Sequence, residues 1–424
     1  MTHISTTVRT KLASLLLAAG VALPSHAQVP SFTWATMAPA PLGRYEALGT
    51  VAEGRLYVFG GFYTTSIIDA TARCDVYDPA TNTWTQLANM PEAMTHTGLA
   101  YDGAGHLYMA GGYVGRHPGP ITEHVWRYDI ATNTWSAGVP LPSGRGGCML
   151  VARGRTLHVF GGAARFGGVS SYDIAEHLTL DLDAPNPTWV ARAPLPNPRN
   201  HLGGVALNGK VYAIGGQHLD NETTENQASV HEYDPATDTW TAKANMPRTL
   251  GHITSTVLAL NNRIVVVAGV TNIAGAVPNL IEFDPVANTW REITPLPERR
   301  HSPVAGVVGG RLLVTGGTYT QLHTETWQSA QVLSAASPLP LTLAGLYPNP
   351  ARTTETVQLT WPGAASGPVQ VEIVDALGRV RHRAQYLWRG AQAGTLATTG
   401  LGAGLYTVRL QQGRQSAAAR LVIQ

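Results

Sequence analysis

Basic, histidine and aromatic side chains recur along this sequence at positions from which they could bind an anionic or sugar ligand. A guanidinium group offers paired donors that match a carboxylate, and aromatic rings add flat apolar surface. The alternative is structural: a basic residue near a proline can belong to a repeat and hold neighbouring loops together. The ligand-binding candidates are Arg44, Tyr63, His96, Tyr113, Arg145, Arg165, Arg199, His201, Gln217, His252, Arg300 and His301.

The sequence carries no recognisable catalytic motif. Fifteen histidines are present, but no two have the helical spacing of metalloproteases, and Cys74 and Cys148 do not form a paired ligand motif. A nucleophile elbow and a phosphate-binding loop are also missing. We therefore predict no catalytic residue, no metal site and no cofactor. Carboxylates paired across distant segments would leave no local motif, because their separation depends on the fold.

Six copies of a repeat organise most of the chain. Each copy has an apolar run that ends in a glycine pair, and the pairs begin at residues 60, 111, 161, 215, 268 and 316. Their spacings are 51, 50, 54, 53 and 48 residues, and Ala268 replaces the first glycine of the fifth pair. After each of the first five pairs an aromatic-Asp turn leads to a tryptophan, as between Tyr77 and Trp84; the third copy, ending at Trp189, is divergent. The runs are apolar on both faces, which is typical of strands covered on both sides.

The tryptophan missing after the sixth glycine pair is found near the start of the chain. Residues 33–41, which include Trp34, match residues 83–91 position by position. We therefore predict that the N-terminal segment supplies the outer strand of the last unit. This strand would close a ring and protect sheet edges that would otherwise be open for pairing.

The glycine pair, the Tyr-Asp turn and the tryptophan at this spacing resemble the Kelch repeat family over about residues 28–336. The resemblance implies an all-β fold with a six-bladed β-propeller. Within each blade, the lead-in loop before the innermost strand and the post-glycine loop after the glycine pair would open on one face. Some Kelch propellers are carbohydrate-active enzymes, such as mutarotases and galactose oxidase relatives, but no residue of their sites is matched here.

A second domain follows a linker at residues 337–341. Its alternating strands predict an antiparallel β-sandwich. Its motifs resemble the type A C-terminal sorting domain of the type IX secretion system, which implies export in a Bacteroidetes-type bacterium; the alternative is an ordinary carbohydrate-binding or Fn3-like sandwich. The motifs lie within residues 342–424 and are Leu346–Ala351, Asp375–Arg379, Leu401–Tyr406 and Leu421–Gln424.

The remaining features concern export and partners. Arg9 and Lys11 precede a short apolar run and small residues up to Ala27, which predicts a signal peptide at residues 1–27. No other stretch is long and apolar enough to span a membrane. The segment between this leader and residue 338 has 19 basic and 24 acidic residues, 19 − 24 = −5, which argues against nucleic acid as a ligand. Both cysteines are expected to be buried and unpaired.

These observations predict an exported recognition module that binds a protein or glycan ligand at the channel mouth. The C-terminal domain would engage the type IX machinery and deliver the protein to the outer cell surface or the medium. We expect a monomer. The alternative function is a carbohydrate-active Kelch enzyme of the mutarotase, epimerase or oxidase type.

Overall fold

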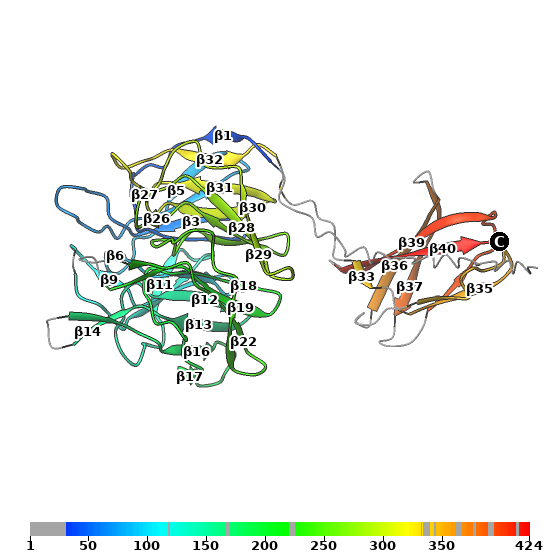
Figure 1. The fold of residues 1–424 in the computed structure, drawn as a ribbon, viewed down its shortest axis with the longest axis horizontal. Coiled ribbons are helices and arrows are strands. Elements are labelled where there is room, and N and C mark those ends of the chain that lie inside the picture. Colours follow the sequence, from blue (N-terminus) through cyan, green and yellow to red (C-terminus); the bar gives the residue numbers. More distant parts are fainter. Residues whose placement is uncertain are drawn as a thin grey trace, which may run out of the picture.

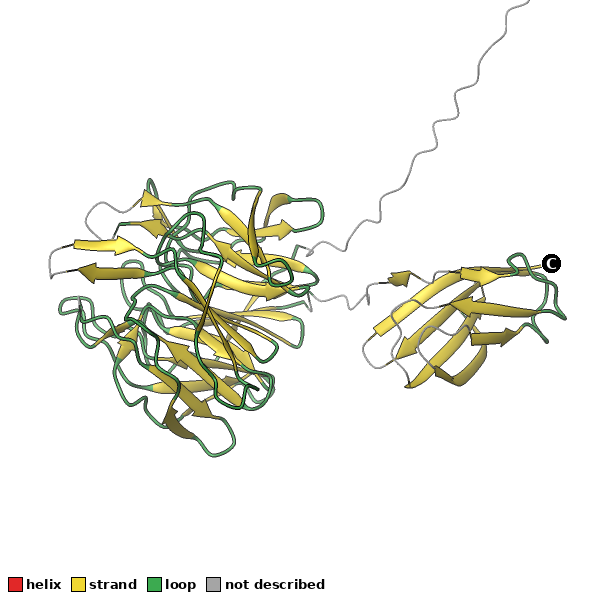
Figure 2. Ribbon diagram, turned by 90° about the horizontal axis from the view of Figure 1, so that it is seen from below, coloured by secondary structure: helices red, strands yellow, loops and turns green. Residues whose placement is uncertain are grey.

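The computed structural model describes residues 31–117, 119–166, 170–219, 225–331, 333, 340–342, 345–360, 367–375, 379–388, 394–412 and 415–424. The predicted signal peptide lies outside these residues. Every regular element that the structure describes is a β-strand (Figure 2), which confirms the all-β prediction. Within the same residues, no helix has the length and apolar character needed to cross a bilayer.

Residues 34–329 form six four-stranded antiparallel sheets, numbered 1 to 6 and written here from the innermost strand outward. Sheets 1 to 3 are β2 (Leu48–Ala52), β3 (Arg55–Phe59), β4 (Cys74–Asp78) and β5 (Thr83–Gln86); β7 (Leu99–Tyr101), β8 (His106–Ala110), β10 (Val125–Asp129) and β11 (Thr134–Ala137); and β12 (Met149–Arg153), β13 (Thr156–Phe160), β16 (His177–Asp181) and β17 (Val190–Arg192).

Sheets 4 to 6 repeat this plan, but the last sheet takes its outer strand from the other end of the region. They are β18 (Gly203–Leu207), β19 (Lys210–Ile214), β22 (Val230–Asp234) and β23 (Thr239–Lys243); β24 (Val257–Leu260), β25 (Arg263–Val267), β28 (Leu280–Asp284) and β29 (Thr289–Ile293); and β30 (Val304–Val308), β31 (Arg311–Thr315), β32 (Thr326–Ser329) and β1 (Trp34–Met37).

The pairing of β1 with β32 joins the first and last strands of the region (Figure 1). Trp34 lies opposite Ser329 in this pairing, which is the arrangement that the match between residues 33–41 and 83–91 predicts. The innermost strands contact one another in the order β2, β7, β12, β18, β24 and β30, and β30 contacts β2. The sheets therefore succeed one another around a common axis.

Each pair of neighbouring sheets shares a separate hydrophobic core. Six buried clusters lie between sheets 1 and 2, 2 and 3, 3 and 4, 4 and 5, 5 and 6, and 6 and 1. In β3, Leu56 faces one neighbour and Phe59 the other, and neither is exposed. Strands with two covered faces need apolar residues on both, which accounts for the low charge of the runs.

Tryptophans at the outer edge join each sheet to the preceding one. In every case the indole N–H donates to a backbone carbonyl in the preceding sheet or its following loop, over 2.7 to 3.1 Å. We call this set the tryptophan belt. The donor and acceptor pairs are Trp34 with Pro295, Trp84 with Ala38, Trp135 with Ala88, Trp189 with Val139, Trp240 with Ala193, and Trp290 with Ala244.

The turn before the tryptophan explains the rest of the motif. Asn82, Asn133, Asp238 and Asn288 adopt a left-handed backbone, with φ of 52° to 55°, a conformation that Asn and Asp tolerate well. Their side-chain oxygens accept backbone N–H groups of the preceding sheet, such as Ala38 N to Asn82 Oδ1 at 2.8 Å. The motif therefore shapes the turn and joins two sheets at once.

Four two-stranded ribbons extend from the post-glycine or lead-in loops of sheets 2 to 5. They are β6 (Met94–Thr95) with β9 (Tyr113–Val114), β14 (Ala163–Phe166) with β15 (Ser170–Asp173), β20 (Gln217–His218) with β21 (Glu225–Asn226), and β26 (Val270–Thr271) with β27 (Gly275–Ala276).

The C-terminal region has two sheets that share one core. Asn349, from the Leu346–Ala351 motif, donates to the carbonyl of Arg420 and accepts from the N–H of Val422, so the first and last motifs fix each other. The sheets are β33 (Pro340–Thr342), β40 (Gln415–Ile423), β39 (Gly404–Gln412), β36 (Gly367–Asp375) and β37 (Val380–Trp388); and β34 (Gly345–Tyr347), β35 (Thr356–Thr360) and β38 (Gly394–Ala397).

Candidate functional site

The lead-in loop of each sheet pairs with the post-glycine loop of the same sheet. Both sets of loops therefore lie on one face of the molecule, which we call the mouth. The bridging pairs are Tyr45 with Phe62, Thr95 with Tyr113, Gly146 with Ala163, Asn200 with Gln217, Gly251 with Val270, and His301 with Thr318.

The glycine pairs allow neighbouring sheets to approach closely at the mouth. In sheet 1 both glycines have positive φ, 59° at Gly60 and 90° at Gly61. A Cβ on Gly60 would lie 2.4 Å from the carbonyl oxygen of Met94 in the next lead-in loop. The Gly61 N–H donates to that oxygen at 3.0 Å, so this position has no room for a side chain.

A ring of six residues surrounds the axis where the innermost strands begin. All six have a left-handed backbone, with φ of 46° to 62°. This conformation costs free energy for a residue other than glycine, and such residues concentrate at functional sites. Backbone bonds connect the ring: Gly147 N donates to His96 O and His201 N to Gly147 O, both at 2.8 Å. We call it the axial ring: Glu46, His96, Gly147, His201, His252 and Ser302.

The axial ring brings three histidines into contact, and His301 extends the series. The ring centroids of His96 and His201 lie 4.7 Å apart, those of His201 and His252 4.4 Å, and those of His252 and His301 4.6 Å. Glu46 closes the cluster from sheet 1. Its carboxylate accepts from His252 Nδ1 and from Ser302 Oγ, each at 2.5 Å.

Neighbouring polar groups fix the orientation of these imidazoles. His96 Nδ1 is 2.7 Å from Thr95 Oγ1, and His201 Nδ1 is 2.5 Å from Asn200 Oδ1. The Asn200 amide in turn donates to Asp173 Oδ1 at 2.5 Å, which sets its carbonyl oxygen toward His201. Since that oxygen can only accept, His201 carries its proton on Nδ1 and leaves the lone pair on Nε2.

Burial controls the charge of the cluster. It lowers the pKa of His201 well below its usual value, and it lowers the pKa of His301 to about 3; the nearby His252 adds to both shifts. Burial alone would raise the pKa of Glu46, but charge on His96 and His252 and the His252 hydrogen bond lower it well below the usual range. The axis therefore holds a buried carboxylate close to His201 and His301, two imidazoles that resist protonation.

Two hollows lie along the axis behind the mouth. A small cavity of about 10 Å³ is bounded by Glu46, His96, His252 and Ser302. Beyond it, a channel of about 330 Å³ runs between the innermost strands and is lined mainly by small and apolar residues, such as Ala206 and Val307. The axial cluster therefore stands between the mouth and this channel.

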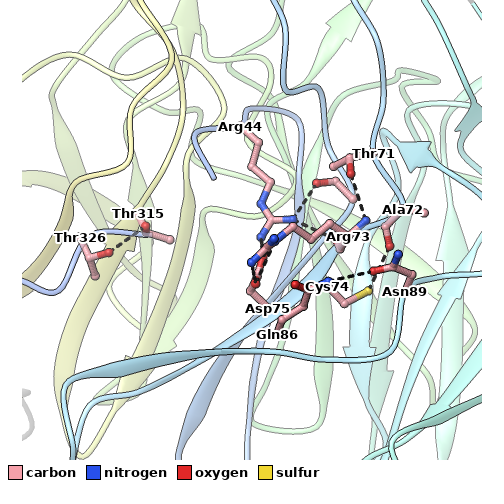
Figure 3. A network of polar contacts seen from close by, with 11 residues as sticks. Arg44, Thr71, Ala72, Arg73, Cys74, Asp75, Gln86, Asn89, Thr315 and Thr326 are labelled. Atoms are coloured by element: carbon pink, nitrogen blue, oxygen red, sulfur yellow. Dashed lines mark hydrogen bonds and ion pairs between the residues drawn. The ribbon is translucent and has the colours of Figure 1, made fainter. Parts of the chain in front are cut away.

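Four of the five arginine candidates are buried and held within the sheets. Arg44 is 2% exposed, pairs with Asp75 and donates to the carbonyl of Arg73 at 2.9 Å; Arg73 binds the same carboxylate (Figure 3). Burial lowers the pKa of Arg44, and Asp75 opposes that shift. A ligand at the mouth would not meet this guanidinium.

The other three buried candidates among the arginines follow the same principle with different partners. Arg145 pairs with Glu176. Arg199 donates to the carbonyls of Gly215 and Ala213 at 2.5 and 3.0 Å, and burial lowers its pKa to about 9. Arg300 pairs with Glu325 at 3.2 Å and stacks 4.3 Å from the ring centroid of Trp327. These contacts fit the structural alternative, in which the basic residues hold neighbouring loops.

The remaining candidates are placed differently. Gln217 is fully buried and Tyr113 is 7% exposed, packed 5.3 Å from His96. Tyr63 is 39% exposed at the mouth. Arg165 lies in β14, and its side chain is outside the described part of the structure. Of the twelve candidates, the four histidines form one cluster.

Sequence reasoning missed two parts of the mouth. Glu46 is not among the candidates because it is neither basic nor aromatic, although it occupies the repeat position of His96, His201 and His252. The second part consists of five exposed apolar side chains, 39% to 99% accessible, each from the post-glycine loop of a different sheet and without a common spacing. We call them the rim: Tyr63, Tyr172, Leu219, Ile273 and Tyr319.

Three family models match the chain. The KLHDC2/KLHL20/DRC7 Kelch-repeats domain matches residues 95–317, the Kelch motif residues 43–91, and the secretion system C-terminal sorting domain residues 345–424. A solved structure, that of YjhT, is 19% identical with a TM-score of 0.53, and the similarity covers 62% of this chain and 88% of that one. At this identity the likeness concerns the fold.

Curated relatives cover different shares of their own lengths. A Kelch repeat-containing protein of Arabidopsis thaliana is 27% identical over 68% of this chain and 71% of its own. The Kelch-like protein terF of Aspergillus terreus is 26% identical over 72% of this chain and 68% of its own. Kelch-like protein 35 of Mus musculus is 29% identical, but the match spans only 34% of that protein.

Proposed function

The chain belongs to the Kelch-repeat family, and from that premise we propose that residues 28–336 form a six-bladed propeller that recognises a protein or glycan ligand at its mouth. The C-terminal sorting domain indicates type IX secretion to the cell surface or the outside, which implies engagement with the type IX machinery. In this proposal a signal peptide at residues 1–27 starts export, and residues 342–424 fold as a β-sandwich that completes it.

The rim is the observation that supports recognition at the mouth. Its five apolar side chains come from five different sheets and are exposed, so they offer apolar and aromatic contacts to a ligand that approaches the mouth from solvent. Arg299 adds a charged group there. Its guanidinium carbon lies 5.5 Å from the centroid of the Tyr319 ring, and its Nη1 donates a hydrogen bond to the Tyr319 hydroxyl at 3.3 Å. Aromatic rings beside a guanidinium suit a glycan or an extended acidic peptide.

Glycan and peptide arrays probed with the full chain test this function. We expect a ligand on one array, and the double variant Ile273→Ala, Tyr319→Ala should bind it at least ~10-fold more weakly, since two exposed anchors are each worth ~1 kcal/mol or more. Val286→Ala is the matched control, because Val286 is 70% exposed in the turn between β28 and β29, at the opposite ends of the strands from the mouth.

Absence of any ligand on both arrays would overturn the recognition function. Equal losses in the rim variant and the Val286 control would move the binding site away from the mouth.

A carbohydrate-active enzyme is the second candidate, and one contact favours it. The Glu46 carboxylate and His252 Nδ1 are hydrogen-bonded at the axis, and a general acid or base acts through such a direct contact. Turnover of a free sugar by the full chain, followed by NMR, would favour this function over binding alone.

A further inference from the structure

The axial cluster has the geometry of a metal centre as well as that of a packed group of side chains. One side-chain nitrogen from each of His96, His201 and His252 lies within 4.8 Å of the other two. Neutral imidazole is a common ligand for divalent first-row transition metals. We propose that His96, His201 and His252 bind one divalent transition-metal ion, such as Zn²⁺, at the floor of the mouth.

A buried nitrogen without a partner is the first independent support. His201 is 1% exposed, and among the described residues its Nε2 has no hydrogen-bond partner. A buried polar atom left unpaired costs about 1–3 kcal/mol, so such atoms in a folded protein point to an unseen water or ion. The lone pair lies on this nitrogen because Nδ1 donates to Asn200, so Nε2 can serve as a ligand.

The supporting contacts match those of metal-binding histidines. A histidine ligand typically donates its other ring N–H to a carboxylate, carbonyl or hydroxyl, which fixes the ring and makes the ligand more basic. Glu46 accepts from His252 Nδ1, Asn200 from His201 Nδ1, and Thr95 lies 2.7 Å from His96 Nδ1. Nδ1 of each histidine therefore has a polar neighbour, which leaves Nε2 of each ring as the candidate ligand atom.

Space and charge favour the same conclusion. Glu46, His96 and His252, but not His201, line a cavity of about 10 Å³ next to the cluster, which is the size of one small ion or water molecule. Glu46 is buried among imidazoles, and a cation would balance its negative charge where solvent cannot. Zn–N bonds are about 2.0–2.1 Å, so binding would draw the three nitrogens closer together.

The backbone holds the three ligands in place. His96, His201 and His252 all have positive φ, 57°, 50° and 55°, a strained conformation that three different sheets impose at equivalent positions. Three residues from distant repeats are thereby directed to one point without a sequence motif. The absence of helical spacing in the sequence is therefore compatible with a histidine site assembled around a ring.

Zinc and cobalt binding to the full chain tests the proposal. After chelator treatment and dialysis, we expect calorimetry and elemental analysis to show one bound equivalent of Zn²⁺. The absorption spectrum of the Co²⁺ form should be that of a site with fewer than six ligands. His201→Asn should weaken binding at least ~10-fold, and Asn was chosen because it tolerates positive φ. His124→Asn is the matched control, since His124 is 47% exposed beside Glu92 and should leave the stoichiometry unchanged.

Two further variants keep the test decisive if His201→Asn does not fold. His252→Asn removes another ligand, and Asn200→Ala keeps all three but removes the partner of His201, with an expected ~10- to 100-fold loss of affinity. No binding at ~100 μM Zn²⁺, or equal binding by wild type and ligand variants, would overturn the proposal and leave a cluster around a water molecule. No glycan or peptide is needed, so failure here is distinct from failure of the recognition function.

Discussion

The tryptophan belt and the axial ring occupy equivalent positions in six repeats, yet they differ in how far their residues vary. The belt carries tryptophan six times, and each indole makes the same hydrogen bond to the preceding sheet. The axial ring has one backbone conformation throughout but carries glutamate, glycine, serine and three histidines. In the belt the fold needs one side chain; in the ring it needs only a left-handed backbone.

This difference separates structural from functional positions within one chain. If stability alone acted on the ring, glycine or asparagine would suit all six places, because both adopt positive φ at low cost. Only Gly147 follows that expectation. The strained histidines and glutamate therefore point to a role that depends on their side chains, whereas the belt has the uniformity of a packing device.

The largest effect should follow from removing a belt residue. Trp135 lies with its ring centroid 5.4 Å from Phe59 and 5.1 Å from Tyr128, and its indole donates to Ala88 O at 3.1 Å. Trp135→Ala should lower the free energy of unfolding by about 3–5 kcal/mol, because it leaves a cavity between sheets 1 and 2. Denaturant unfolding of the full chain measures this loss.

Trp135→Phe is the control for the same site. It keeps most of the ring packing and removes the hydrogen bond, so it should cost less than the alanine variant by a few kcal/mol. An unfolding midpoint of Trp135→Ala equal to that of the wild type would show that the belt does not hold the sheets together.

Acid should lower the free energy of unfolding before the carboxylates titrate, through the buried histidines beside the belt and through His201 and His301 at the axis. Burial lowers the pKa of His158 to about 3 and that of His177 to about 4. The unfolded chain binds these protons near pH 6.5 and the folded chain does not. The free energy of unfolding should therefore fall as the pH drops from 7 to 5, by up to about 2 kcal/mol per histidine.

A repeat-based variant separates the two contributions. His158 and His177 pack beside Tyr233 and Trp240 of the belt, and the equivalent positions in sheet 4 carry Tyr212 and Val230. His158→Tyr with His177→Val should reduce the loss of stability between pH 7 and 5. His201 and His301, whose pKa values burial also lowers, should account for part of what remains. A pH dependence unchanged by the double variant would contradict neutral burial of this pair.

The sequence predicted the fold well because the belt is periodic. Trp34 alone located the strand that pairs with β32, since its neighbours match those of Trp84. The sequence also included His96, His201 and His252 among the twelve candidates without singling them out as a group, and two further features escaped. The arginines were expected at the surface of the mouth. Instead four of them lie inside, where partners such as Asp75 in β4 compensate their charge. The rim has no period at all, because loop tips are free to vary.

The smallest effect concerns the one glycine pair that departs from the repeat. In five sheets the second glycine donates to the next lead-in loop, as Gly61 does to Met94, at 2.7 to 3.0 Å. Among the described residues, Gly269 makes no such bond, and the residue before it is Ala268, with φ of 58°. A Cβ at the equivalent glycines would lie 2.4 to 2.8 Å from the acceptor carbonyl, so the methyl group keeps sheets 5 and 6 apart here.

Ala268→Gly should therefore stabilise the protein slightly. Relief of left-handed strain contributes about 1–2 kcal/mol, and a new hydrogen bond about 1. Loss of a buried methyl group costs about 0.8 kcal/mol. The greater freedom of the unfolded glycine chain costs about 0.4–1 kcal/mol. The sum of these contributions is a gain in stability of about 1 kcal/mol. Gly215→Ala, the reverse change in sheet 4, should destabilise by more than this. A destabilised Ala268→Gly variant would show that the methyl packs favourably and that the missing bond has another cause.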